Sequence, residues 1–215
     1  SYFRQVVPML KELKEPFYAF TVTLTSHGPF DIPEEKRVLN LDTELDKNEL
    51  GGYFESIRYT DTQIGEFLKQ LDAEGILDNT VVVIEGDHTG VHKYYNSSIE
   101  KLSDKEDWYL DNGHHTMPFI IWSKDMNEGK TYDTIGGQVD IMPTMLYLLG
   151  VENDKYLNTA LGRNLLNTNK SFAVLTNLEV VGENLTDEEK DLYKNIVELS
   201  DKMIRANNTT VNENN

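Results

Sequence analysis

An acid and a histidine stand side by side directly after a run of β-branched residues. The run is "TVVVI" at residues 80–84, and Asp87 and His88 follow it closely. A carboxylate oxygen and an imidazole nitrogen suit Zn, Mn or Mg in a mixed coordination shell. An ion held there could polarise a phosphoryl or sulfuryl oxygen and activate a nucleophile. Gly86 and Gly90 favour the sharp turn that would let both side chains reach one ion. The alternative is that Asp87 caps the following turn and His88 packs on it.

A second histidine could take part in the same chemistry. His27 lies in "TSHGPF", just after another strand-like run. A histidine at that position could contact a substrate oxyanion or exchange a proton near neutral pH. The alternative is a loop histidine that is hydrogen-bonded to the backbone. Thr25 and Ser26 are candidate nucleophiles only because they precede it.

Four more residues are candidates for lining the same cleft. His92, His114 and His115 flank a long polar stretch, and long loops in compact domains are often functional. The 114–115 pair could add a metal ligand, or one of the two could line the cleft while the other is solvated. Arg163 in "GRNLL" could contact an anion, and a surface or structural ion pair is the alternative.

Strands must position these groups. Strand-like runs at 17–24 and 80–84 end just before His27 and Asp87, and a third run lies at 117–122. The 80–84 run lacks polar alternation, which is expected of a strand buried on both faces. In open α/β sheets ligands bind beyond the carboxyl ends of the strands. The candidate groups therefore lie at the edge where a ligand is expected.

Helices separate these strands. Apolar residues recur every three or four positions over 47–73, which predicts a long amphipathic helix whose aromatic residues, Tyr53 among them, belong to the core. A second helix is predicted over 139–150, with Gly150 as its stop. The alternation of strands and helices is typical of an α/β domain with a largely parallel sheet.

The last part of the chain has a different pattern of predicted secondary structure. "SFAVLTN" and "LEVVG" predict the two short strands of a hairpin. A terminal helix is predicted over 186–206, because Thr186 and Glu189 form a capping box ahead of an apolar stripe. The remaining polar residues, "NNTTVNENN", are typical of a frayed tail.

Charge and composition exclude some classes of partner. The chain has 215 residues, with 37 acidic and 20 basic side chains and a net charge of −17. This balance argues against nucleic acid and against electrostatic docking on anionic lipid. An acidic protein that handles an anionic substrate must focus positive charge locally, most simply with a metal cation. The absence of cysteine excludes disulfides and thiolate metal sites. No apolar run is long enough to span a membrane, and the start at Ser1 suggests an excised fragment.

An ordered set of motifs then resembles a known family. "TSHGPF", "YFESIRYTDTQIGEFLKQL", "DNTVVVIEGDHTG", "MPFIIW" and "GGQVDIMPTMLYLLGV" follow the order seen in the C-terminal half of sulfatase-like enzymes of the alkaline phosphatase superfamily. The lipoteichoic acid synthases, which are phosphoglycerol transferases, are the most similar group. The resemblance extends over about residues 17–206. It implies a three-layer α/β fold with a largely parallel sheet flanked by helices, followed by an antiparallel hairpin and a terminal helix.

The resemblance also implies roles for individual residues. One divalent cation is expected, Mn first and Mg, Zn or Ca as alternatives, with Asp87 and His88 as two of its ligands. His27 matches the histidine that meets the glycerophosphate group. The family's Glu ligand, nucleophilic Thr, and substrate-pocket Arg and Trp belong to its N-terminal half, so no catalytic nucleophile is expected here and the fragment alone should be inactive. Residues 1–170 should form part of the catalytic domain, 171–207 its hairpin and last helix, and 208–215 a disordered tail.

The function implied is the metal-dependent transfer or hydrolysis of a phosphate ester. The expected case is phosphoglycerol transfer in the synthesis of a lipoteichoic-acid-type polymer, with a glycerophospholipid substrate and no nucleic-acid partner. The parent protein would lie in the cell membrane of a Gram-positive bacterium, anchored by segments outside this chain, with its catalytic domain outside the cell. A sulfuric ester hydrolase is one alternative. A non-catalytic surface or interaction domain is the other.

Overall fold

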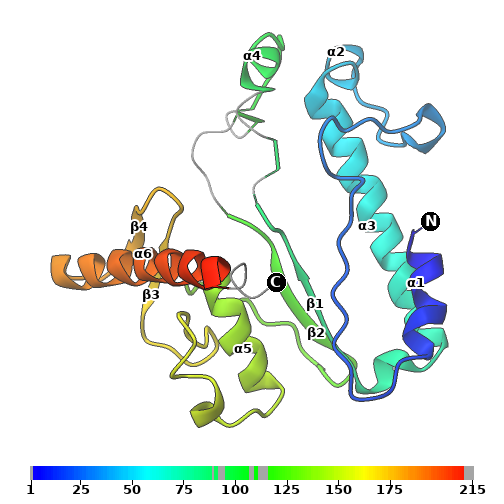
Figure 1. Ribbon diagram of the computed structural model, residues 1–215. Helices are drawn as coiled ribbons and strands as arrows, with labels where there is room; N and C mark the ends of the chain where they lie inside the picture. The colour runs from blue at the N-terminus through cyan, green and yellow to red at the C-terminus, as the bar shows by residue number, and fades with distance from the viewer. Residues whose placement is uncertain (1, 89, 92–94, 107–108, 111–115, 211–215) are drawn as a thin grey trace. The chain divides into compact units, whose positions relative to one another are not determined.

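The computed structural model describes residues 2–88, 90–91, 95–106, 109–110 and 116–210, with side chains in the last helix described as far as residue 206 (Figure 1). The chain divides into two compact units, residues 1–128 and 129–215, and each is described by itself. None of the helices in these described ranges is long and apolar enough to cross a membrane. The boundary that the sequence analysis places at residue 170 stays a prediction.

Helix α3, Glu49–Ala73, is the scaffold of the first unit and confirms the predicted long helix. It begins where the Asn48 side chain accepts a hydrogen bond from Leu50 N, and Gly75, at φ 72°, ends it with a left-handed turn. Helix α1, Tyr2–Lys11, packs along its C-terminal half, with the Phe3 and Phe67 rings stacked at 4.4 Å. This contact closes one end of the unit's core.

The two strands that the structure describes in the first unit run antiparallel, whereas the sequence analysis expected a largely parallel sheet without assigning particular pairs. β1, Val81–Glu85, pairs with β2, Phe119–Ser123, so that Val83 faces Ile121. A parallel pair needs a crossover that returns the chain to the start of the first strand. Here the chain leaves and re-enters at one end of the pair, where Gly86 N donates to Pro118 O at 3.1 Å. β1 is also half-buried over Val81–Ile84, where burial on both faces was expected.

The far end of this strand pair is tied back to α3 by an ion-pair cluster. Lys124 follows β2 and donates to Asp72 of α3 at 2.7 Å and to Asp78 at 2.6 Å. Asp78 belongs to η2, the short 3₁₀ helix Ile76–Asn79 that links α3 to β1. These hydrogen bonds raise the pKa of Lys124, so the amine stays charged.

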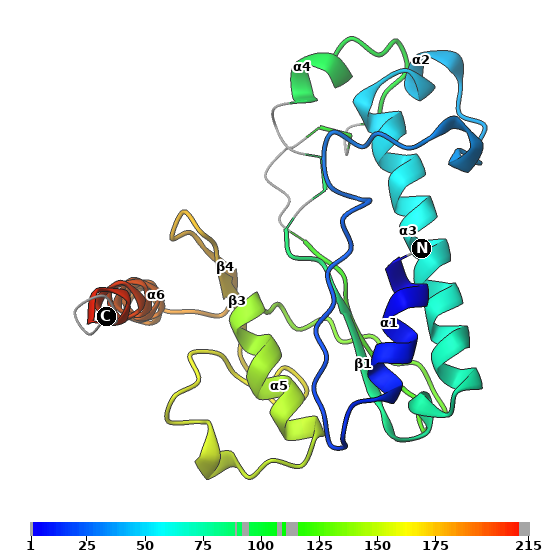
Figure 2. The ribbon, with the colours of Figure 1, turned by 45° about the vertical axis from the view of Figure 1, so that its right-hand side comes forward.

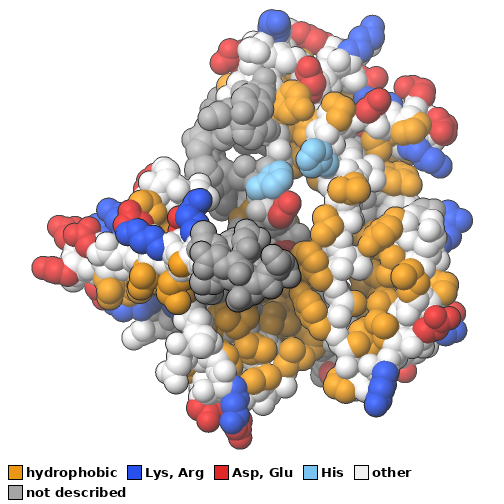
Figure 3. Space-filling model, viewed as in Figure 1, with side chains coloured by type: hydrophobic (Ala, Val, Ile, Leu, Met, Phe, Trp, Pro, Cys, Tyr) orange, Lys and Arg blue, Asp and Glu red, His pale blue; other side chains and the backbone are white. Residues whose placement is uncertain are grey.

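The segment at 17–24 is not a strand, which is a second correction. It passes alongside β1 in both ribbon views, and none of the described residues pairs with it in a ladder (Figures 1 and 2). Its alternate side chains are exposed and apolar: Tyr18 87%, Phe20 66%, Val22 54% and Leu24 76%. Apolar side chains gather on the face of the molecule shown in Figure 3. The composition of the segment favours a β-strand, but a strand forms only where a partner strand supplies hydrogen bonds.

A buried carboxylate anchors the irregular segment that leads from His27 to α3. This segment contains only the 3₁₀ helix η1, Glu34–Lys36, and the short helix α2, Thr43–Asp46. Glu55 of α3 is 1% exposed, and its carboxylate accepts from Val38 N at 2.8 Å and from Leu39 N at 2.9 Å. A buried charge is stable only when it is compensated, and here two backbone donors compensate it.

The second unit confirms the predicted hairpin and terminal helix. β3, Ser171–Val174, pairs antiparallel with β4, Val180–Glu183, and α6, Asp187–Thr210, packs on them through stacked Phe172 and Tyr193 rings at 4.0 Å. The capping box also forms, since Thr186 N donates to Glu189 and Glu189 N donates to the Thr186 hydroxyl. The helix continues to Thr210, so the first residues of the predicted tail are helical.

The remaining elements of this unit are helical and short. The helix predicted over 139–150 is the 3₁₀ turn η5, Gln138–Asp140, followed by α5, Ile141–Leu148. Gly150 ends it at φ 72°, as predicted. A 3₁₀ turn, η6 at Asn153–Lys155, follows. Among the described residues of the first unit, the short helix α4, Asn96–Ile99, contacts the start of α3.

Replacing Glu55 tests whether its carboxylate anchors the loop. Glu55→Gln leaves one amide oxygen where two carboxylate oxygens accepted, so the free energy of unfolding should fall by about 1–3 kcal/mol in urea denaturation. Glu66→Gln is the control, because Glu66 lies on the same helix and makes an exposed pair with Lys69 at 2.8 Å. Equal losses for the two variants would contradict the assignment.

Candidate metal and substrate site

Asp87 and His88 form a two-donor pair at the end of β1. His88 Nε2 lies 3.6 Å from Asp87 Oδ2, and the two side chains are 69% and 81% exposed. Two ligands bound to one ion at about 2.1 Å each lie roughly 3.0–3.5 Å apart. At 3.6 Å the pair lies just above this range, so a small side-chain shift would bring both atoms to one cation, and its exposure leaves an approach open.

The pair supplies only part of a coordination shell. Metal sites in proteins commonly use three or four protein ligands. Within the ranges that the structure describes, no group of three or more His, Asp or Glu side chains could hold an ion. His92, His114 and His115, predicted to line the cleft, lie outside the described residues, so their roles stay predictions.

His27 lies in a loop that opens onto a cavity of about 500 Å³. Its Nδ1 donates to Gly28 O at 2.8 Å, because a carbonyl oxygen can only accept. This leaves Nε2 as the atom that can meet a ligand, as an acceptor in the neutral ring and as a donor in the protonated ring. Lys36, Tyr59 and Asp31 also line the cavity, which therefore combines an imidazole, an amine and a phenol with one carboxylate. Such a set suits an anion that carries hydroxyl groups.

Aromatic packing fixes this loop against α3. Phe30, which is 5% exposed, lies edge-on to the Tyr53 ring at 5.2 Å and 5.6 Å from the Tyr95 ring. Its backbone has φ 62°, an uncommon conformation for a bulky residue that survives only where the surroundings enforce it. Gly52 of α3 permits the approach, since a Cβ there would lie 2.8 Å from Phe30 O. The sequence analysis placed Tyr53 in the core and gave Phe30 no role.

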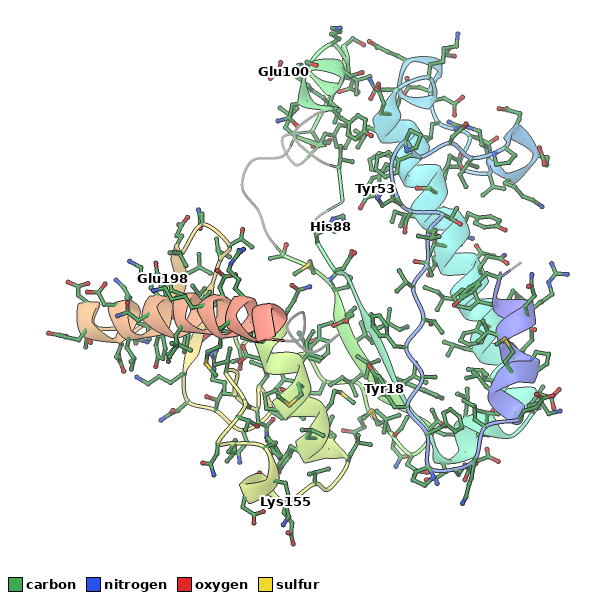
Figure 4. All side chains as sticks on the ribbon, viewed as in Figure 1. Tyr18, Tyr53, His88, Glu100, Lys155 and Glu198 are labelled. Carbon is green, nitrogen blue, oxygen red and sulfur yellow. The ribbon has the colours of Figure 1, made fainter. Side chains whose placement is uncertain are left out.

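The structure brings the predicted groups of the first unit together through Tyr53. The ring of Tyr53 contacts Phe30 in the His27 loop, and its hydroxyl end lies against Gly90, two residues beyond His88. In Figure 4, Tyr53 lies on the side of α3 that faces the segment carrying His88. One side chain thus contacts both the loop of the predicted substrate-binding residue and the turn of the predicted metal ligands.

Arg163 is committed to contacts within the second unit. Its Nη2 donates to Ile135 O at 2.8 Å and to Phe172 O at 2.7 Å, and the guanidinium lies 3.9 Å above the Phe172 ring. Its Nη1 is 3.7 Å from Asp140. Of the two interpretations that the sequence left open, these contacts favour the structural ion pair over the anion contact.

Asp140 is the buried partner in this network, and the sequence analysis did not single it out. It is 1% exposed, and its carboxylate accepts from Gly137 N at 2.9 Å and from Arg163 N at 2.7 Å. Its carbonyl oxygen accepts from the Thr144 hydroxyl at 2.7 Å. Its position at the start of the predicted helix, three residues after Gly137, is the sequence signal that could have indicated a cap.

The comparisons with known proteins assign the chain to a family. The family model described as Sulfatase matches residues 1–151, which include the His27 loop, the Asp87–His88 pair and α5. The chain belongs to the sulfatase family. This confirms the resemblance on which the sequence analysis relied.

Two curated relatives show which members of the family the chain is similar to. Lipoteichoic acid synthase 1 of Bacillus subtilis is 35% identical over 157 residues, which are 73% of this chain and 24% of that protein. Lipoteichoic acid synthase of Staphylococcus saprophyticus is 32% identical over 180 residues, 81% of this chain and 26% of that protein. The chain thus spans about a quarter of the length of these relatives.

The solved structure supports the fold. It is the crystal structure of the lipoteichoic acid synthase LtaP from Listeria monocytogenes, with a TM-score of 0.77, 24% identity, and coverage of 94% of this chain and 58% of that one. The chain therefore shares the fold of that part of LtaP. At this level of sequence identity the match is evidence for the fold alone.

Arg163→Ala tests the structural assignment. Removing the guanidinium leaves the buried Asp140 carboxylate without its cation, so the free energy of unfolding should fall by about 3 kcal/mol in chemical denaturation. Arg58→Ala is the control, because Arg58 makes an exposed pair with Asp61 at 3.0 Å. A stable Arg163→Ala protein with weakened binding of an anionic ligand would instead support the anion contact.

Proposed function

We propose that this chain is part of a metal-dependent phosphoglycerol transferase that acts in the synthesis of a lipoteichoic-acid-type polymer. The observation that carries the proposal is the Asp87–His88 pair, with donors 3.6 Å apart at the end of β1. It lies in the same unit as the His27 cavity and within the residues that match the sulfatase family. The relatives named lipoteichoic acid synthase support the choice of reaction.

The residues of this chain would divide the work between binding and orientation. Asp87 and His88 would hold one divalent cation, Mn²⁺ by preference, with Mg²⁺, Zn²⁺ or Ca²⁺ as alternatives. When bound, the cation supplies Lewis-acid polarisation of a phosphoryl oxygen. His27 would present Nε2 to the transferring group, either stabilising its charge or passing a proton. The family's nucleophilic Thr and Glu ligand would come from residues outside these 215.

The substrate would be a glycerophospholipid, and the acceptor a hydroxyl of the growing polymer or water. Lys36 in the His27 cavity supplies positive charge for the phosphate in a chain of net charge −17. We infer that the whole protein is held in the membrane of a Gram-positive bacterium with this domain outside the cell, as expected for lipoteichoic acid synthesis. The predicted largely parallel sheet would need strands in addition to β1 and β2.

A sulfuric ester hydrolase is the second candidate, because the matching family model is described as Sulfatase. Assays of the purified full-length protein with phosphatidylglycerol and with an aryl sulfate, both in Mn²⁺ buffer, distinguish the two functions. We expect release of diacylglycerol from the lipid and no sulfate release. Sulfate release alone would overturn the transferase assignment.

His88→Ala and Asp87→Asn test the metal pair. Each removes or weakens one of the proposed ligands, so metal-dependent turnover of the full-length protein should fall by more than about 100-fold, because even substitutions around metal ligands cost 10–100-fold. Mn²⁺ affinity, measured by calorimetry, should fall in parallel. Asp133→Asn is the control, since Asp133 is an exposed acid of the second unit. Wild-type metal affinity in both site variants would refute the assignment of Asp87 and His88 as metal ligands and would favour a non-catalytic domain.

A further inference from the structure

Tyr53 is placed on α3 where its two ends contact different parts of the candidate site. Its ring packs beside the buried cluster of Leu50, Ile99 and Leu102, which fixes its direction. One edge of the ring meets Phe30 of the His27 loop at a centroid distance of 5.2 Å. The hydroxyl end projects past this cluster toward the chain that follows β1.

The hydroxyl end of Tyr53 leaves no space for a side chain at residue 90. A Cβ built on Gly90 would overlap the Tyr53 hydroxyl and the ring carbon that carries it. Gly90 therefore allows its backbone to lie directly against the phenol, which any other residue would prevent. Because Gly90 is two residues beyond His88, this contact limits where the Asp87–His88 turn can lie.

We propose that Tyr53 is the positioning residue of the Asp87–His88 turn, holding the proposed metal ligands in register with the His27 loop through its contacts with Gly90 and Phe30. The inference rests on the proposed function of Asp87 and His88 as metal ligands, and it concerns what orients them. Exposed ligands on an irregular turn gain affinity when their geometry is fixed before the ion binds, because binding then orders less of the chain. An aromatic side chain on a long helix is suited to this, since it has few rotatable bonds.

The environment of Tyr53 agrees with such a role. Burial raises the pKa of its phenol, so the group stays neutral across the physiological range. A neutral phenol can rest against the backbone at Gly90 without adding a negative charge to the segment that carries Asp87. Phe67, another aromatic residue of α3, has a ring of similar size that stacks on Phe3 at 4.4 Å instead. It provides the matched control.

The experiment measures Mn²⁺ affinity by calorimetry in the full-length protein, together with thermal stability. Gly90→Ala should weaken Mn²⁺ binding by about 10-fold or more, the size seen when groups that orient metal ligands are changed. Gly65→Ala should leave binding unchanged, because a Cβ at Gly65 meets nothing within 4 Å. Tyr53→Leu should weaken binding, whereas Phe67→Leu should lower stability with wild-type affinity.

A double variant distinguishes positioning from general damage. In Gly90→Ala/Tyr53→Leu the smaller side chain admits the new methyl group, so the loss of Mn²⁺ affinity should be smaller than the sum of the two single losses. Additive losses, or wild-type affinity in Gly90→Ala, overturn the proposal. If Gly90→Ala does not fold, Tyr53→Phe decides: it keeps the ring and removes the hydroxyl, and affinity equal to wild type overturns the proposal.

The same measurements separate this inference from the proposed function. A wild-type protein that does not bind Mn²⁺, or a His88→Ala protein that binds it as well as wild type, refutes the metal site itself. Binding that depends on His88 but is unaffected by Gly90→Ala and Tyr53→Phe refutes only the positioning role of Tyr53.

Discussion

The first unit depends on the contact between α3 and the irregular segment that follows His27. This segment has little regular structure of its own, so its position must come from side chains of the helix. Glu55 supplies two carboxylate oxygens to backbone donors of the segment, and Gly52 lets the backbone of Phe30 approach the helix closely. Buried polar groups carry a large penalty when they are unpaired, so the two backbone hydrogen bonds favour one loop position strongly over others.

With this contact in place, α3 becomes the common support of two functional segments. The His27 loop packs on its N-terminal half, and the turn after β1 meets the same part of the helix through Tyr53 and Gly90. A site assembled from loops gains precision when both rest on one long element, because the helix fixes the distance between them. In a chain of net charge −17, the position of Lys36 along the His27 cavity places a positive charge where an anion would bind.

The strands show where sequence reasoning reaches its limit. The composition of residues 80–84 and 117–122 predicted two strands, and both form. Their composition did not predict that this pair is antiparallel, since direction depends on the end of the pair at which the connecting chain re-enters. The segment at 17–24 has the composition of a strand and exposes an apolar face of Tyr18, Phe20, Val22 and Leu24. Strand propensity depends on the residues of one segment, whereas a hydrogen-bonded ladder needs two segments. The sequence of one segment does not specify which other segment pairs with it.

The sequence by itself determined the chemistry that the chain can offer. The ordered motifs that include His27, Asp87 and His88 resembled those of the sulfatase family. The same residues indicated the candidate ligands, because ligand character is a property of the side chain alone. Only the tertiary structure decided how the other residues are used. In the second unit Arg163 pairs with Asp140. Tyr53, which was expected only in the core, contacts both the His27 loop and the turn after β1. These roles depend on distances between residues far apart in the chain, which packing sets.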